Sequence, residues 1–305
     1  MRLSDEWPTL ALLVGVYAVF AGLTLLGDDL PTLIVVLGLA VIIAQHSSLQ
    51  HEVLHGHPFK SGWLSDLTVF PALGLFVPYQ RFKDTHLAHH YDPNLTDPYD
   101  DPETNFLDRV KWDKLPRPLK ILAQFNNTLA GRMMIGPAIS LALFYWGDLG
   151  KLAKGERRVW RSYLEHALGV ALVLWWVVVL CEMPIWTYLM AAYLGMSLLK
   201  IRTFLEHQAH DRSAARSVII EDRGPLALLF LNNNYHAVHH AHPKLAWHKL
   251  PGLLDSRRDH FLTRNGGYTY GSYLDVFRLF FLRAKDPVVH PLWTRSNRRR
   301  VEGQE

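Results

Sequence analysis

The chain has 305 residues, of which 49% are apolar and 12% aromatic, and its formal net charge is +4. This composition supplies a substantial core, and the mild positive balance comes without any nucleic-acid recognition motif. The single cysteine, Cys181, excludes a disulfide framework, a thiolate metal site and an iron–sulfur cluster built from this chain alone. Seventeen histidines against one cysteine indicate imidazole as the metal ligand.

The first predicted element is a helical hairpin. Apolar runs cover about 7–26 and 31–46, and the turn GDDLP joins them. No lysine or arginine occurs between Arg2 and Lys60. Uncharged apolar runs of this length are typical of membrane-spanning helices. The sequence therefore predicts two spans here.

Two apolar stretches in the middle of the chain are weaker. Residues 65–79 are short and interrupted by proline and glycine, and residues 133–146 are also short. Neither stretch is long enough to cross a membrane as a helix. We expect both to form interfacial hairpins rather than to cross a membrane.

A second hairpin follows a strongly basic segment, KLAKGERRVWR. Its predicted spans are 163–180 and 185–199, joined by the tip CEMP. No lysine or arginine occurs between Arg161 and Lys200. Two hairpins whose tips lack lysine and arginine are hard to explain in a soluble protein with buried core helices, which is the less favoured alternative. The sequence predicts an all-α integral membrane protein with about four transmembrane helices.

The distribution of positive charge predicts the orientation of these spans. Nearly all lysines and arginines lie in segments 47–162 and 200–305, and such segments stay in the cytoplasm. We therefore expect both termini in the cytoplasm, with a histidine-rich helical cap on that face. Residues 1–305 are expected to form a single membrane-bound domain.

The histidines gather in short motifs. These are HEVLH at 51–55, HLAHH at 86–90 and HAVHH at 236–240, and FLEHQAHD adds His207 and His210. On a helix, residues three and four apart share one face, so each motif can present two or three imidazoles to one point. All of them lie in the segments predicted to be cytoplasmic.

The first motif taken alone has another interpretation. His51-Glu52-x-x-His55 is the signature of a zinc metalloprotease, in which the glutamate is the general base. Catalytic zinc takes three protein ligands and a water, whereas eight or nine convergent imidazoles suit two metal ions with open positions. Imidazole suits iron as well as zinc, so the number of ligands disfavours a protease.

The three motifs, in this order around two hairpins, resemble the histidine boxes of the membrane fatty-acid desaturase superfamily, which includes hydroxylases and carotenoid ketolases. The resemblance covers about residues 40–255. It implies a non-haem di-iron centre on the cytoplasmic face, with dioxygen as co-substrate. By position it implies these iron ligands: His51, His55, His86, His89, His90, His207, His236, His239 and His240.

The wording of the motifs is closer to one compact bacterial branch, grouped with dihydrorhizobitoxine desaturase, which implies the bacterial inner membrane. The expected activity is oxygen-dependent desaturation of an acyl chain or an acyl-like small metabolite, and hydroxylation or ketone formation is the alternative. The chain has no nucleotide-binding motif and no cysteine set for an electron-transfer domain. A separate donor, a ferredoxin- or rubredoxin-like protein or another reductase, is therefore expected.

Several polar residues beside the motifs are candidates for orienting the ligands through hydrogen bonds. One asparagine before the third motif is expected, by the resemblance, to hold a metal-bound water. The acids of the Asp-Pro-rich loop 92–102 are expected to cap helices, and His46, His57, His242 and His248 to be structural. The candidates for orienting ligands are Glu52, Glu206, Asp211, Asn232 and Asn233.

Overall fold

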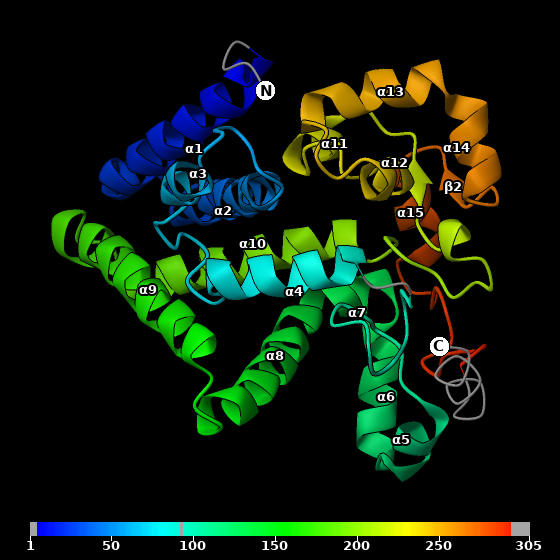
Figure 1. Cartoon of the computed structure of the whole chain (residues 1–305). Coiled ribbons are helices and arrows are strands. Elements are labelled where there is room, and N and C mark those ends of the chain that lie inside the picture. Colours follow the sequence, from blue (N-terminus) through cyan, green and yellow to red (C-terminus); the bar gives the residue numbers. More distant parts are fainter. Residues whose placement is uncertain (1–4, 92–93, 294–305) are drawn as a thin grey trace.

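The computed structural model describes residues 5–91 and 94–293 (Figure 1). The described chain is mostly helical, as predicted. Its one small sheet pairs β1 (Ile219–Ile220) in parallel with β2 (Thr269–Tyr270). In Figure 1, α1 and α9 lie at one side of the molecule, and the C-terminal helices α11 to α15 gather at the other.

The first hairpin consists of α1 (Trp7–Leu25), a 3-10 turn at Gly27–Asp29 and α2 (Thr32–Leu54). A proline in the first turn of α1 suits a helix start, where its missing N–H costs nothing. Helix α2 continues well beyond the predicted end at residue 46. Its last turns therefore carry most of the first histidine motif.

The second hairpin consists of α9 (Arg157–Leu174), a π-helical continuation at Trp175–Leu180 and α10 (Ile185–Thr203). Within residues 5–91 and 94–293, three helical stretches are long and apolar enough to cross a membrane: Trp7–Leu25, Thr32–Leu54 and Arg157–Leu180. Helix α10 does not reach this threshold, because tyrosines and the charged Lys200 and Arg202 lower its hydropathy. The predicted membrane character is supported, but the count of four spans is not confirmed.

Helix α10 packs closely along α2. A Cβ atom on Gly195 would lie 2.9 Å from the Ile43 Cγ2 atom and 3.1 Å from the Ala40 carbonyl oxygen, so only glycine permits this approach. The fully buried Ala191 and Ala192 on the same helix also keep the two helices close together. This contact fixes α10, and the segment that follows it, against the end of α2.

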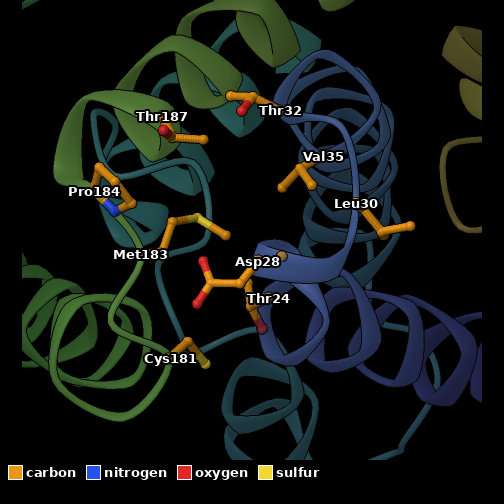
Figure 2. Close-up of a pocket in the computed structure, with 10 residues that line it drawn as sticks. Thr24, Asp28, Leu30, Thr32, Val35, Cys181, Met183, Pro184 and Thr187 are labelled. Atoms are coloured by element: carbon orange, nitrogen blue, oxygen red, sulfur yellow. The ribbon is translucent and has the colours of Figure 1, made fainter.

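The two hairpin tips lie together at one end of the bundle. They line a cavity of about 180 Å³ that includes Thr24, Asp28 and Val35 from the first hairpin and Cys181 and Met183 from the second (Figure 2). His51, the first histidine of the HEVLH motif, lies sixteen residues beyond Val35 on α2, or about 24 Å along the helix. The cavity is therefore remote from the histidine motifs and does not form part of their site.

The remaining helices connect the hairpins and cover their histidine-bearing end. The helices outside the two hairpins are α3 (Gly62–Thr68), α4 (Tyr79–Tyr91), α5 (Arg109–Lys114), α6 (Arg117–Asn126), α7 (Leu129–Met134), α8 (Gly136–Ala153), α11 (Pro225–Leu229), α12 (His236–Ala241), α13 (Leu250–Ser256), α14 (Arg258–Arg264) and α15 (Tyr273–Phe280). The stretch 65–79, predicted to be interfacial, contains the end of α3 and an irregular segment, and the stretch 133–146 falls within α7 and α8.

A buried ion pair attaches α4 to α8. The Arg81 guanidinium donates two hydrogen bonds of 2.8 Å to the Asp148 carboxylate, and both side chains are about 95% buried. Tyr163 of α9 donates to the same carboxylate at 3.2 Å. Asp84, one turn further along α4, pairs with Arg158 of α9. One face of α4 is thus held by charged contacts, and the opposite face presents its histidines to the bundle.

Candidate metal centre

Four segments bring the histidines of the motifs together. His51 lies in the last turns of α2, and His55 is its C-terminal cap. Helix α4 carries the second motif and α12 the third, and His207 follows the end of α10. All nine residues named by the resemblance meet in one region, and most of them are buried.

The nine side chains divide into two groups that could each hold a metal ion. Within each group, the ligand atoms lie within 4.8 Å of one another. Each of the second and third motifs is split between the groups, rather than serving one point as its spacing suggested. The first group is His51, His55, His86, His90 and His239; the second is His89, His207, His236 and His240.

In the second group the Nε2 atoms converge closely. The Nε2 atom of His207 lies 2.8 Å from that of His89 and 3.0 Å from that of His236. The Nε2 atom of His240 lies 3.1 Å from that of His236. All four rings therefore point the same type of nitrogen at a common point.

The first group has the same character. The Nε2 atom of His90 lies 3.0 Å from that of His86 and 3.1 Å from that of His239. The Nε2 atoms of His51 and His55 are buried and make no hydrogen bond within the described structure. The two groups are neighbours, because the His90 ring stacks on the His240 ring of the second group at 4.1 Å between centroids.

Hydrogen bonds at the far side of four rings hold this orientation. The Nδ1 atom of His89 lies 2.8 Å from an Asp101 oxygen, and that of His86 lies 2.9 Å from Glu103. The Nδ1 atom of His236 contacts the Asn233 carbonyl oxygen at 3.2 Å, and that of His207 contacts the Ser217 hydroxyl at 3.2 Å. Such bonds fix the ring and its tautomer in metal-binding histidines.

These contacts test whether the site suits a cation. Asp101 and the Asn233 carbonyl oxygen are acceptors, so His89 and His236 carry protons on Nδ1 and present Nε2 lone pairs. Both lone pairs face the His207 Nε2 atom. This atom carries at most one proton, so it can donate a hydrogen bond to only one of them. At least one pair of nitrogens therefore meets without a hydrogen bond, and a metal ion between them removes that repulsion. The donor set fits a bound metal.

At most of these histidines the electrostatics favour the neutral form, and His89 is the exception, which must lose a proton to a bound metal. Burial and then neighbouring imidazoles lower the pKa of His55 to about 2 and of His90 to about 3. Burial also lowers the pKa of His89, but the nearby Glu103 and Asp101 carboxylates outweigh it and raise the pKa to about 9. A neutral imidazole is the form that binds a metal. Burial and adjacent imidazoles likewise lower the pKa values of His207, His236, His239 and His240 well below the usual range.

Two of the proposed orienting residues lie where they can act. The Asn233 carbonyl oxygen faces His236, and its amide nitrogen donates to the buried Glu206 carboxylate at 3.2 Å. Glu206 also pairs with Arg202 at 3.0 Å. The Asn232 amide instead donates to the Trp247 backbone carbonyl oxygen at 3.1 Å, so of the two asparagines Asn233 contacts a metal-binding ring in the described structure. The metal-bound water expected at one of them stays a prediction.

Two other candidates do not contact the metal-binding rings in the described structure. Asp211 is exposed on the surface. The Glu52 carboxylate accepts a hydrogen bond from the Trp247 backbone N–H at 3.0 Å and lies 3.7 Å from the His57 ring. Glu52 adjoins His51 in sequence, but one residue turns a helix by about 100°, so its side chain leaves the cluster.

The contacts of Asp101 and Glu103 with the ligand rings were not predicted. The acids of the loop 92–102 were expected to cap helices, yet Asp101 is buried and contacts His89, and Glu103 contacts His86. A signal was present, because acids closely following a histidine motif are within reach of its outward nitrogens. The histidines expected to be structural do have other surroundings: His46 contacts Tyr17, and His57 contacts Glu6.

Replacing Asp101 with asparagine is expected to weaken metal binding about 10- to 100-fold, because the amide is a weaker acceptor for the His89 N–H. The measurement is the concentration of a chelator that removes half of the bound metal. Asp113→Asn is the control, since Asp113 is exposed and its carboxylate pairs with the exposed Arg109. Equal chelator resistance in the two variants would contradict a role for Asp101.

The comparison with known proteins agrees with this geometry. The fatty acid desaturase family model matches residues 30–272, which include all four histidine-bearing segments. No curated protein matches the chain significantly. The match covers well over half of the 305 residues, so it identifies the family of the chain. This protein is a member of the fatty acid desaturase family, whose members are oxidoreductases.

Proposed function

We propose that this protein is a membrane-bound, non-haem di-iron desaturase that introduces a double bond into an acyl chain or an acyl-like small metabolite. The observation that carries the proposal is the division of nine buried or half-buried histidines into two adjacent groups. All-imidazole ligation with open positions suits iron that reacts with dioxygen. The family match supplies the class of reaction.

Two iron ions bound by these groups would supply the reductive activation of dioxygen. The substrate loses two hydrogen atoms from neighbouring methylenes, a donor supplies two electrons, and two protons enter, so dioxygen leaves as two waters. The protein contributes the geometry. Asp101, Glu103 and Asn233 orient three of the ligand rings, and burial of the histidines keeps bulk water away from the site.

The zinc protease alternative is disfavoured by two observations. A protease needs three protein ligands for one ion, whereas five histidines surround the first position alone. The proposed base, Glu52, accepts a backbone hydrogen bond from Trp247 and so faces away from the cluster. Hydroxylation or ketone formation remains the alternative within the same family.

The setting of the enzyme is also part of the proposal. We place α10 as the fourth span, since it returns from a hairpin tip that lies beside the tip of the first hairpin. The positive charge of segments 47–162 and 200–305 favours a cytoplasmic metal centre. The resemblance to a bacterial branch implies the bacterial inner membrane. A separate ferredoxin- or rubredoxin-like protein, or another reductase, supplies the electrons. Among bacterial branches, the motifs most resemble the one grouped with dihydrorhizobitoxine desaturase.

Metal analysis of protein purified without added metal tests the class of enzyme. About two irons per chain are expected, because the two histidine groups offer two positions. One zinc per chain and no iron would overturn the proposal.

Lipid and metabolite profiles of an expressing strain test the reaction. A product lighter than its precursor by two hydrogens supports desaturation, whereas a product with one added oxygen assigns the chain to the hydroxylases. A strain that expresses a variant lacking a metal-binding histidine supplies the background profile.

A further inference from the structure

Trp247 is held by three separate segments of the chain. Its backbone N–H donates to the Glu52 carboxylate at 3.0 Å, and its indole N–H donates to the Thr9 hydroxyl at 3.2 Å. Its backbone carbonyl accepts the Asn232 side-chain amide at 3.1 Å. Each polar group of this residue therefore has a partner on a different element: α1, α2 and the turn before α12.

The partners are themselves fixed. Thr9 is fully buried and Glu52 is 5% exposed. The His57 Nδ1 atom lies 3.1 Å from both carboxylate oxygens of the buried Glu6, and its ring lies 3.7 Å from Glu52. Glu6 and Thr9 belong to the start of α1, which lies outside the region matched by the family. This polar cluster joins the start of α1 to the end of α2 and to the segment that follows α12.

The position of Trp247 makes these bonds relevant to the metal groups. Helix α12 ends at Ala241, and the short segment after it leads directly to the turn that Trp247 begins. On the other side of the bond, Glu52 lies next to His51 on α2. The first metal group contains His51 and His55 from α2 and His239 from α12, so it requires these two helices to keep a fixed separation.

We infer that Trp247, with Glu52, Thr9 and Asn232, forms a clamp that sets α12 against α2, and that Glu52 is a positioning residue which acts as a hydrogen-bond acceptor. The glutamate of the HExxH motif thus serves neither as a base nor as a ligand. Its effect on catalysis passes through the spacing of the first metal group, so this part of the inference rests on the proposed function. The clamp itself does not depend on which metal binds.

The chemistry of the clamp distinguishes two substitutions. Glu52→Gln keeps an acceptor oxygen for the Trp247 N–H. Glu52→Leu has a similar volume and removes the acceptor, leaving the Trp247 N–H without a partner. If Glu52 acted as a general base, both variants would lose function. If it acts as a hydrogen-bond acceptor, only Glu52→Leu loses function.

The test measures hydrogen exchange of the peptide that contains Trp247, together with iron content, in purified full-length protein. In Glu52→Leu, exchange at the Trp247 amide is expected to be about ten-fold faster, the equivalent of one hydrogen bond, with reduced iron. Glu52→Gln is expected to retain wild-type protection and iron. Thr9→Val, which is remote from the ligands and keeps its shape, is expected to loosen the same peptide without affecting the Glu52 bond.

Each result has a defined meaning. Unchanged exchange in Glu52→Leu overturns the clamp, whatever the metal content. Equal loss of iron in Glu52→Gln and Glu52→Leu also overturns it, because the acceptor oxygen alone is then insufficient. If the wild-type protein binds no iron but its Trp247 peptide still exchanges more slowly than that of Glu52→Leu, the clamp stands and the di-iron function is rejected. The two failures are therefore distinguishable.

Discussion

Replacing His239 with alanine is expected to abolish product formation and to lower the metal content from about two ions per chain to one or none. His239 belongs to the first group and connects α12 to α2, with ring centroids 4.8 Å from His51 and 4.6 Å from His55. Its Nε2 atom lies 3.1 Å from that of His90 on α4. The substitution therefore removes the imidazole ligand at which α2, α4 and α12 meet.

His242→Ala is the matched control for this variant. It lies three residues further on, at the C-terminal end of the same helix, and its side chain is exposed. Iron content and product yield are expected to stay within about two-fold of wild type, as for most surface substitutions. A His239→Ala protein that retained both would contradict the assignment of α12 to the metal centre.

Replacing Asp148 with alanine is expected to destabilise the protein by about 3–5 kcal/mol, because it leaves the Arg81 guanidinium buried without its main partner. The remaining contact of Arg81, with Asp84, is longer at 3.3 Å. Since Arg81 anchors α4, the three histidines of that helix lose their fixed position. The measurement is the thermal midpoint in detergent, with iron content determined on the same samples.

Two further variants show whether the effect comes from the buried charge. Glu165→Ala breaks an ion pair of α9 whose arginine is 81% exposed, and a cost of at most about 1 kcal/mol is expected. The double variant Arg81→Met/Asp148→Leu removes both charges and is expected to recover most of the stability and iron lost in Asp148→Ala. Failure of this recovery would indicate that α4 requires the ion pair itself.

The histidine motifs predicted the residues that meet, but not how they are sorted. Spacing on a helix defines which side chains share a face, and the i,i+4 pairs His86/His90 and His236/His240 do stay together. The remaining histidine of each motif, His89 or His239, lies in the other group. This exchange depends on how α4 and α12 face one another across the bundle, which no local pattern contains.

The fold shows the same division between local and non-local information. Hydropathy predicted the hairpins, because an apolar run needs no partner to be identified. Hydropathy ended the second span at residue 46, since it does not show that the polar residues around that point, Gln45, His46 and Ser48, are buried by tertiary packing. The partner of Glu52 was likewise inaccessible, because Trp247 is 195 residues away from Glu52 in the chain.

The convergence of four distant segments on two neighbouring points also has a consequence for the unfolded chain. Two ions held there would act as cross-links, closing loops between α2 and α4, between α4 and the segment after α10, and between that segment and α12. Cross-links that close long loops lower the conformational entropy of the unfolded state. In a chain whose only cysteine is Cys181, the metal pair would take the place that disulfides occupy in secreted proteins. The cofactor that performs the reaction would then also hold together the four distant segments of its own scaffold.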